Sequence, residues 1–427
     1  MRLSIIMRLS HTQHKEYSGR AFLHKINMKI DQQLIDSIKE QFDKMQTKAD
    51  FIKLLNDTKK ILYGEDAGPV TPKALYFFAD YRNGQKRYKQ FAIKKKSGGS
   101  RTINAPKKGL KTIQKVLNII IQCVFEPHSA ATGFVPDKSV VDNAKAHTGK
   151  NYVYNIDLKD FFPSIEIHRV KACFKIPPFN LKDDREPLAF LIANLCCTEM
   201  EVERLVNGEW LTVKRSVLPQ GAPTSPTITN IVSQSLDKRL ANLAASFGAT
   251  YTRYADDITF SSDHSIYQKN GKFLNKLNEI IRQNNFTINQ KKVRLQKTGH
   301  RQEVTGITVN EKTNVSQRYI KQIRMWLYYW ETYGYDKAEQ IFRKDYIADR
   351  GYVKSHKAKL INVIDGKLLY LKMVRGENDL TCLKLKDRFI ELISENSPVN
   401  ILLDIWENEG IDQAIEVFNQ KYEKYEG

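Results

Sequence analysis

The four residues Tyr254-Ala255-Asp256-Asp257 place the strongest constraint on the fold of this chain. The residues on both sides, 251–253 and 258–261, alternate in polarity, which predicts two strands that meet at a tight turn. Adjacent carboxylates repel each other and are costly to bury, and a cation at the turn removes that cost. The pattern therefore predicts a hairpin that presents two carboxylates to a cation. For the pair taken alone, a solvated Asp-Asp turn is the other interpretation.

A second acidic segment follows an apolar run. The run Tyr152–Ile156 ends on Asp157 and predicts a central strand of the same sheet, with Asp157 beside Asp256. Mg²⁺ takes one or two protein carboxylates and completes its shell with water and phosphate oxygens. Two such ions about 4 Å apart can activate a hydroxyl and stabilise a pyrophosphate leaving group. Three Asp residues on two adjacent strands suit that arrangement.

A third segment, Leu218–Pro226, leads from a loop into a helix. Ser225 is expected as the N-cap residue and Pro226 as the first helical residue. Gln220 and Gly221 would put an amide and exposed backbone near a nucleotide. A well-capped joint between loop and helix is the alternative interpretation.

Periodicity predicts mixed helices and strands around these segments. Helices are expected at 183–197, 225–247 and 267–284, strands at 250–260 and 303–309, and a hairpin that turns at Gly98-Gly99. This pattern favours an α+β block built on an antiparallel sheet.

Composition bounds the class of protein. The 427 residues are 41% hydrophobic and 27% charged, which indicates a soluble chain of several domains. No apolar run approaches the roughly 18 residues of a membrane span. The five cysteines form no C-x-x-C pair, so neither a disulfide scaffold nor a structural zinc site is indicated. We expect a cytoplasmic protein without a membrane partner.

The charge is uneven along the chain. The net charge is +20, but residues 395–427 hold eight acids and two bases, so the first 394 residues carry +26. Such an excess predicts a polyanionic partner, with nucleic acid favoured over an anionic membrane surface. The acidic tail could pack on the preceding helices or bind a partner.

In chain order, Asp157 with Phe162, the Leu218–Pro226 string and the Tyr254–Asp257 box resemble motifs A, B and C of reverse transcriptases. Three further segments resemble the fingers hairpin, motif D and the primer grip of motif E: Lys96–Arg101, Asn289–Lys292 and Val304–Ile307. The resemblance covers about residues 75–392.

Two segments resemble retron reverse transcriptases in particular: Asn143-Ala144-Lys145-Ala146-His147 and Val304-Thr305-Gly306. On a helix, Asn143 and His147 would share one face. Without the family, a structural pair of hydrogen-bonding side chains is the better interpretation of these two residues.

The resemblance implies a right-hand polymerase fold of the α+β class, with fingers, a palm built on an antiparallel sheet, and a helical thumb. An N-terminal helical segment and a short C-terminal helical tail would flank it. The expected parts are an N-terminal arm and helices, fingers, palm, thumb and acidic tail at 1–70, 71–150, 151–312, 313–394 and 395–427.

The resemblance also implies the roles of single residues. Asp157, Asp256 and Asp257 would be catalytic, and with the Leu158 carbonyl they would hold two Mg²⁺ ions, for which Mn²⁺ could substitute. Lys96, Arg101, Gln220 and Gly221 would bind the nucleotide, Phe162 would be a steric gate against a 2′-OH, and Lys292 or its neighbour Lys291 would protonate the leaving group. Residues implied in RNA binding are Asn143, His147, Val304, Thr305, Gly306, Arg318, Lys321 and Arg324.

The implied function is an RNA-directed DNA polymerase that copies a cognate structured non-coding RNA into multicopy single-stranded DNA from deoxynucleoside triphosphates. Priming from a guanosine 2′-OH and an effector protein in anti-phage defence come with the resemblance. Two alternatives stay open. One is another bacterial reverse transcriptase class with a 3′-OH primer, and the other is a non-catalytic RNA-binding scaffold.

Overall fold

The computed structural model describes residues 31–80, 82, 84–94, 99–206, 209–350 and 358–395, together with Ile405, Gln413 and Glu416. The chain divides into two compact units, one of Met1–Ser139 with Tyr154–Leu295 and one of Val140–Val153 with Gln296–Gly427. In the described part of the chain, no helix combines the length and apolar character needed to cross a membrane.

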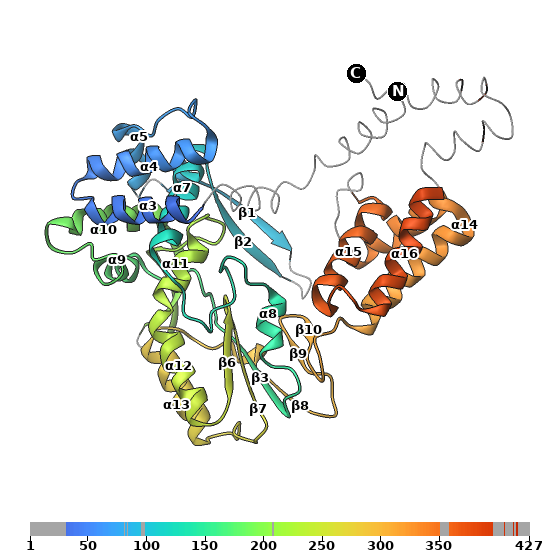
Figure 1. Ribbon diagram of the computed structural model, residues 1–427. Helices are drawn as coiled ribbons and strands as arrows, with labels where there is room; N and C mark the ends of the chain where they lie inside the picture. The colour runs from blue at the N-terminus through green and yellow to red at the C-terminus, as the bar shows by residue number, and fades with distance from the viewer. Residues whose placement is uncertain are drawn as a thin grey trace. The chain divides into compact units, whose positions relative to one another are not determined.

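Helices make up much of the first unit. They are α3 (Gln32–Lys44), α4 (Lys48–Tyr63), α5 (Pro72–Ala79), α6 (Gly84–Arg87), α7 (Lys108–Val124), α9 (Ile167–Lys175), η1 (Asp183–Arg185), α10 (Glu186–Cys196), α11 (Ser225–Val232), α12 (Gln234–Ser246), α13 (Lys272–Gln283) and η2 (Gln290–Lys292). The amphipathic α7 packs against α3 and α4 and buries Leu110, Leu117 and Ile121 (Figure 1). A reciprocal capping box of Thr47 and Asp50 begins α4.

The central sheet has the strand order β6-β7-β3-β8. The bounds are β3 (Tyr152–Asp157), β6 (Thr250–Tyr254), β7 (Asp257–Ser262) and β8 (Arg294–Lys297). α12 packs on β6, and Phe273 of α13 meets Phe260 of β7 edge to face, so these helices cover one side of the sheet (Figure 1). The apolar side chains that alternate along β6 and β7 are therefore buried on the side that these helices cover.

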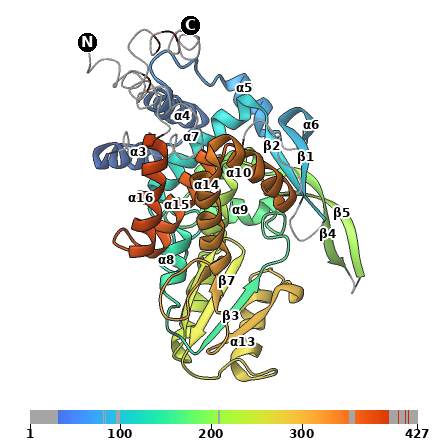
Figure 2. The same ribbon diagram turned by 90° about the vertical axis from the view of Figure 1, so that its right-hand side faces the viewer.

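Two antiparallel hairpins extend the first unit. β1 (Tyr88–Lys94) pairs with β2 (Ser100–Pro106), as the sequence predicts. β4 (Thr198–Val206) pairs with β5 (Glu209–Val217), and Figure 2 shows this long hairpin at the edge of the unit. β4 and β5 were not predicted from the sequence, although Glu alternates with Met200 and Val202 in β4, which is a strand pattern.

The second unit is mainly helical. Its elements are α8 (Val140–Lys145), β9 (Glu303–Val304), β10 (Ile307–Thr308), α14 (Gln317–Arg350), α15 (Leu360–Arg375) and α16 (Leu380–Glu395). Trp326, Trp330 and Phe342 of α14 form a core with buried residues of α8, β9, β10, α15 and α16. Gly334, at φ 73°, interrupts the helical backbone of α14.

Several predicted elements differ from the observed ones. The predicted helix 225–247 is divided at Ser233 into α11 and α12, and the predicted helix 183–197 begins as the separate turn η1. The predicted strand 303–309 is a pair of two-residue strands around a turn at which Thr305 and Gly306 have positive φ. The α+β class and the helical character of 313–394 are as expected, while the five-part division of the chain stays a prediction.

Candidate active site

The turn between β6 and β7 carries the paired acids, as predicted. Tyr254 pairs with Asp257, which leaves Ala255 and Asp256 as a two-residue loop. Such short loops need positive φ at a central position, and Ala255 has φ 57°. Asp256 is therefore displayed from the loop, whereas Asp257 begins strand β7.

Asp157 ends β3 and meets this turn through the backbone. The amide of Leu158 donates to the carbonyl of Asp256 at 3.0 Å. On the other side, the Asn289 amide donates to the Asp157 carbonyl at 2.8 Å, and Asn289 Nδ2 donates to Asp157 Oδ1 at 3.1 Å. The two acidic segments, 157–158 and 256–257, thus come together as expected, and the segment before η2 joins them.

The site concentrates negative charge next to one lysine. Burial and the nearby Asp157 charge raise the pKa of Asp256, and burial with the Asp256 and Asp157 charges raises the pKa of Asp257 to about 6. Protein surrounds much of the Asp257 carboxyl, but the residue still reaches solvent at the edge of the site. Lys292 Nζ lies 2.7 Å from Asp157 Oδ2, so of the two adjacent lysines considered, the structure pairs Lys292 with the site.

The donor set fits a hard divalent cation. Within the described residues, no three His, Cys, Asp or Glu side chains are close enough together to hold a metal ion by themselves. Mg²⁺ does not require such a cage, because it binds one or two carboxylates and fills its shell with water and substrate oxygens. The carboxylates of Asp157, Asp256 and Asp257 are oxygen ligands of this kind, and their mutual repulsion favours a cation between them.

A buried polar network supports the turn from below, and the sequence analysis missed it. Arg253 donates from Nη2 to Asp237 Oδ2 at 2.6 Å and from Nε to Asp237 Oδ1 at 2.7 Å. It also reaches Asn230 Oδ1 at 3.1 Å and the Ala255 carbonyl at 3.2 Å. Burial alone would lower the pKa of Arg253, but the Asp237 carboxylate outweighs it and raises this pKa. A charged residue on the inward-facing side of a strand was the available signal.

A second support is the segment 130–133. The Arg253 amide donates to the Ala130 carbonyl, and the Thr132 amide donates to the Arg253 carbonyl, both at 2.9 Å. A Cβ on Gly133 would lie 2.5 Å from the Ala255 nitrogen. This position therefore requires glycine, because the backbone passes so close to the acidic turn.

The loop before α11 lies against the fingers hairpin. The Asn104 amide of β2 donates to the Gln220 carbonyl at 2.8 Å. Gly221 has φ +117°, and a Cβ there would meet Asn104 O at 2.9 Å. Further along β2, Arg101 is exposed, and its charge lowers the pKa of Asp256 against the stronger effect of burial. Lys96 lies outside the described residues.

The expected cap of α11 is corrected by the structure. Thr224, not Ser225, is the N-cap residue, and Ser225 is already helical. The hydroxyl of Ser225 instead donates to the Pro219 carbonyl at 2.7 Å. Ser225 therefore stabilises the preceding loop, which contains Gln220 and Gly221, and does not cap the N-terminus of α11.

Phe162, five residues after Asp157, lies in an aromatic group. Its ring centroid is 5.8 Å from that of Phe161 and 6.2 Å from that of Phe134. Phe161 is buried, whereas Phe162 is only half-buried. The ring of Phe162 thus retains a face that a substrate can contact.

The residues predicted to bind RNA divide into buried and exposed groups. Asn143, His147 and Val304 are fully buried, which agrees with the structural interpretation of Asn143 and His147, while RNA binding by all three stays a prediction. Asn143 Nδ2 donates to Thr305 Oγ1 at 3.4 Å, which ties α8 to the β9–β10 turn. α8 ends at Lys145, so His147 is not on its helical face as expected.

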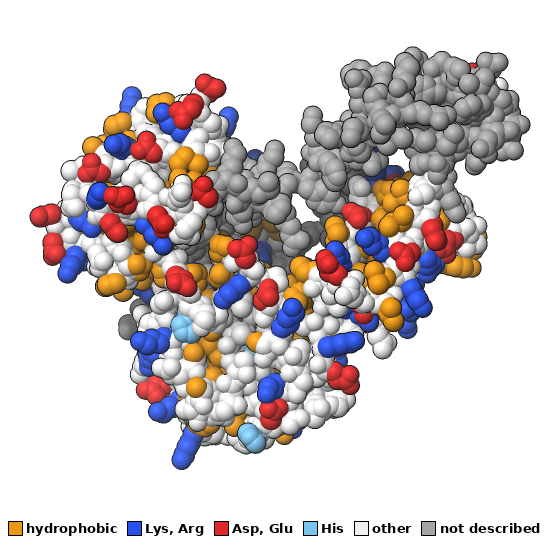
Figure 3. Space-filling view, in the orientation of Figure 1, with side chains coloured by type: hydrophobic (Ala, Val, Ile, Leu, Met, Phe, Trp, Pro, Cys, Tyr) orange, Lys and Arg blue, Asp and Glu red, His pale blue; other side chains and the backbone are white. Residues whose placement is uncertain are grey.

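The exposed group lies on α14 and at the β9–β10 turn. Arg318, Lys321 and Arg324 follow one another at helical spacing on α14 and are all exposed, and Gly306 is exposed at the turn. On the face seen in Figure 3, Lys and Arg side chains are interspersed with Asp and Glu rather than gathered in one patch. The predicted tail contacts fall outside the described residues, Ile405 apart.

Comparison with known proteins gives a consistent result. The family model described as "Reverse transcriptase (RNA-dependent DNA polymerase)" matches residues 93–314. The chain is 35% identical over 300 residues to Retron Mx65 reverse transcriptase and 39% identical over 235 residues to Retron Mx162 reverse transcriptase, both of Myxococcus xanthus. It is 32% identical over 259 residues to Retron Ec86 reverse transcriptase of Escherichia coli.

The three matches cover 69%, 52% and 60% of this chain. In the same order, they span 63%, 47% and 72% of the relatives' own lengths. The first two relatives are therefore matched over less than two thirds of their sequence.

Proposed function

This chain belongs to the retron reverse transcriptases, and from that premise we propose that it is an RNA-directed DNA polymerase that copies a cognate structured RNA into single-stranded DNA. One observation carries the proposal. The backbone hydrogen bond from Leu158 to Asp256 brings Asp157 and Asp256 together, and Lys292 lies beside Asp157. Phosphoryl transfer depends mainly on positioning and charge neutralisation, which this arrangement can supply.

Asp157, Asp256 and the Leu158 carbonyl would hold two Mg²⁺ ions, or Mn²⁺ in their place, with Asp257 in support. When bound, such ions lower the pKa of an attacking hydroxyl and stabilise the pyrophosphate leaving group. Lys292 would hold a proton near the leaving group, and its position at Asp157 supports that role over Lys291. The hydrogen bonds from Asn289 would keep the Asp157 carboxylate oriented.

The nucleotide would lie between the carboxylates and the fingers hairpin. Arg101 would grip the triphosphate as a planar fork, with Lys96 as a point charge. Gln220 and Gly221 would line the pocket, since their loop lies against β2. Phe162 would exclude a ribonucleotide by occupying the space that a 2′-OH needs, which discriminates by repulsion rather than attraction.

Primer extension tests the polymerase proposal. Asp256→Ala and Asp257→Ala are expected to abolish DNA synthesis on an RNA template, whereas Asp184→Ala, an exposed acid of η1, should retain the parental rate. Folding of each variant is checked by its unfolding transition. A parent that makes no more DNA than the background seen with Asp256→Ala would favour the non-catalytic scaffold, and equal synthesis above background would contradict the role of Asp256.

The finer proposal is priming from a guanosine 2′-OH of the cognate RNA, encoded beside the gene, with an effector protein in anti-phage defence. Family membership supports it. DNA made on that RNA should keep one ribonucleotide after RNase digestion and lose it to a 2′,5′-debranching enzyme. A product that debranching leaves unchanged indicates a 3′-OH primer, the mode of other bacterial reverse transcriptases.

A further inference from the structure

Phe134 contacts two aromatic residues of the active site without belonging to either motif. Its ring centroid is 6.2 Å from that of Phe162 and 6.4 Å from that of Tyr254. Both distances fall within the range in which aromatic pairs attract each other. Phe134 thus links the predicted gate residue of one motif to the first residue of the acidic turn.

The backbone before Phe134 is held firmly in place. Asn230 Nδ2 donates to the Gly133 carbonyl at 3.0 Å, and Thr132 hydrogen-bonds to Arg253 through both its amide and its hydroxyl. Phe134 itself has φ 62°, a left-handed backbone conformation that residues other than glycine rarely adopt. Conformations of this kind persist where surrounding contacts over-determine them, and they cluster at functional sites.

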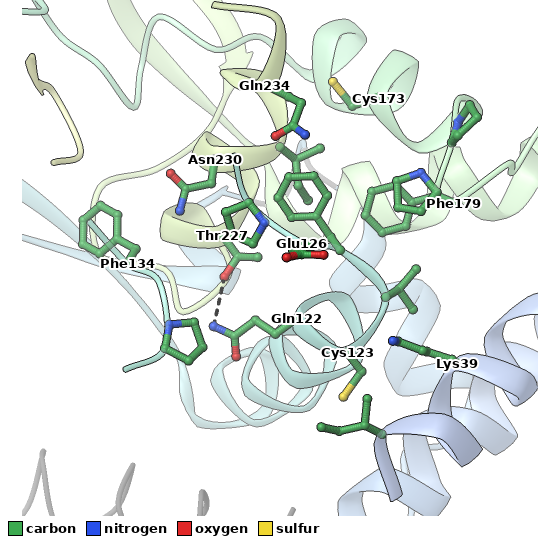
Figure 4. Close-up of a pocket in the computed structure, with 18 of the residues that line it drawn as sticks. Lys39, Gln122, Cys123, Glu126, Phe134, Cys173, Phe179, Thr227, Asn230 and Gln234 are labelled. Carbon is green, nitrogen blue, oxygen red and sulfur yellow. Dashed lines mark hydrogen bonds between the residues drawn. The ribbon is translucent and has the colours of Figure 1, made fainter. Parts of the chain in front are cut away.

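Open space lies on another side of Phe134. The residue lines a pocket of about 770 Å³, and Figure 4 shows it at one end, with Asn230 and Thr227 nearby and Phe179 toward the other end. Without the Phe134 ring, the Phe162 ring would lose one of its aromatic neighbours and gain room to move on that side. A steric gate discriminates between substrates only while the side chain that forms it cannot move aside.

We propose that Phe134 is a specificity-determining residue, which fixes the ring of Phe162 in the position that excludes a ribonucleotide. The inference rests on the proposed function, in which Phe162 is the gate. Phe134 acts here as a positioning residue, because its ring contacts Phe162 and Tyr254.

Single-nucleotide incorporation on an RNA template tests the proposal, with each nucleotide offered as its deoxy and its ribo form. Phe134→Ala should raise the ribo-to-deoxy ratio of kcat/KM by about tenfold, the lower end of what one shape contact is worth. Its kcat for the deoxynucleotide should stay within a few-fold of the parent. Phe77→Ala, which removes an exposed ring of α5, should change neither value.

Two further variants make the test decisive. Phe162→Ala should relax discrimination directly, and the double variant should be no more permissive than Phe162→Ala, because both changes act on one ring. Phe134→Leu keeps most of the apolar bulk, so it serves if Phe134→Ala fails to fold, and it should raise the ratio by a smaller factor.

The outcomes separate the two claims. If Phe162→Ala relaxes discrimination while Phe134→Ala and Phe134→Leu leave the parental ratio, the inference on Phe134 is wrong and the gate stands. If Phe162→Ala keeps the parental ratio, the gate itself is wrong and the inference falls with it.

Discussion

Arg253 and Asp237 form a fully buried ion pair, 2.6 Å between Nη2 and Oδ2, directly beneath the turn that displays Asp256. Asp237→Leu would leave the Arg253 guanidinium buried without its counter-charge. Because an uncompensated buried charge is costly, we expect a loss of about 3–5 kcal/mol in the free energy of unfolding, measured by urea denaturation.

Removing both members of this pair distinguishes its contribution to stability from its role in positioning the turn. Arg253→Met with Asp237→Leu removes both charges and should recover most of that stability. The double variant still lacks the donor to the Ala255 carbonyl, so we expect its DNA synthesis to stay well below that of the parent. A double variant with the parental rate would show that the pair serves stability alone.

Gly133→Ala places a methyl group against the acidic turn. A Cβ there would lie 2.5 Å from the Ala255 nitrogen, so the turn or the 130–133 segment must move. We expect about 1–3 kcal/mol of destabilisation and a larger fractional loss of primer extension. Gly68→Ala is the control, because nothing lies within 4 Å of a Cβ at that position. Similar activity of the two variants would contradict the close approach.

Lys292 and Lys291 are adjacent, but the structure pairs Lys292 with Asp157. If Lys292 holds the proton for the leaving group, Lys292→Ala should slow single-turnover incorporation by roughly 100-fold. Lys291→Ala should stay within a few-fold of the parent. Equal losses in the two variants would remove the distinction that the geometry makes.

The exposed basic face of α14 predicts a measurable salt dependence. Each of Arg318, Lys321 and Arg324 that neutralises a phosphate should lower the slope of log K against log salt by about 0.7–0.9 when replaced by Ala. For a primer–template duplex, the slope of the triple variant should thus be smaller in magnitude by about 2–3. Lys337→Ala with Lys344→Ala, beyond the Gly334 interruption, is the control. An unchanged slope in the triple variant would exclude this face from the nucleic-acid path.

The burial of His147 predicts that the free energy of unfolding changes with pH. Burial lowers the pKa of His147 from 6.5 to about 3, so the unfolded chain gains a proton there below pH 6.5 and the folded chain does not. This difference destabilises the fold as pH falls from 6.5 toward 3, by about 1.4 kcal/mol per pH unit. We expect His147→Gln to lose stability less steeply than the parent between pH 6.5 and 5 in urea titrations. Parallel pH profiles would mean that His147 is protonated in the folded chain.

The carboxylate hairpin could be predicted from sequence because its information is local. Strand alternation on both sides of Tyr254–Asp257 implies a turn, and the apolar run before Asp157 implies a strand end. The β4–β5 hairpin was missed although Glu199, Glu201 and Glu203 alternate with apolar residues in β4. In β5 the adjacent Trp210 and Leu211 interrupt such an alternation. Its strands are held by pairing with each other, which periodicity in one strand does not reveal.

The supports of the site were missed because they are non-local. The sequence near Gly133 does not indicate that its backbone lies close to the nitrogen of Ala255, a residue more than a hundred positions further along the chain. The same holds for Arg253, whose partner Asp237 lies on a helix with no acidic motif of its own. Asn143 and His147 were singled out from the sequence, but their burial beside the core that contains Val141 and Ala144 depends on packing rather than on spacing.

The register of the β6–β7 hairpin has a consequence for engineering this chain. Tyr254 pairs with Asp257 across a loop of two residues, and a slip of one residue would turn every side chain of a strand to the opposite face. Side chains in this turn can be exchanged one at a time, but its length cannot be varied. Libraries, tags and spectroscopic labels that add residues therefore belong elsewhere in the chain, and variation here should be confined to substitution.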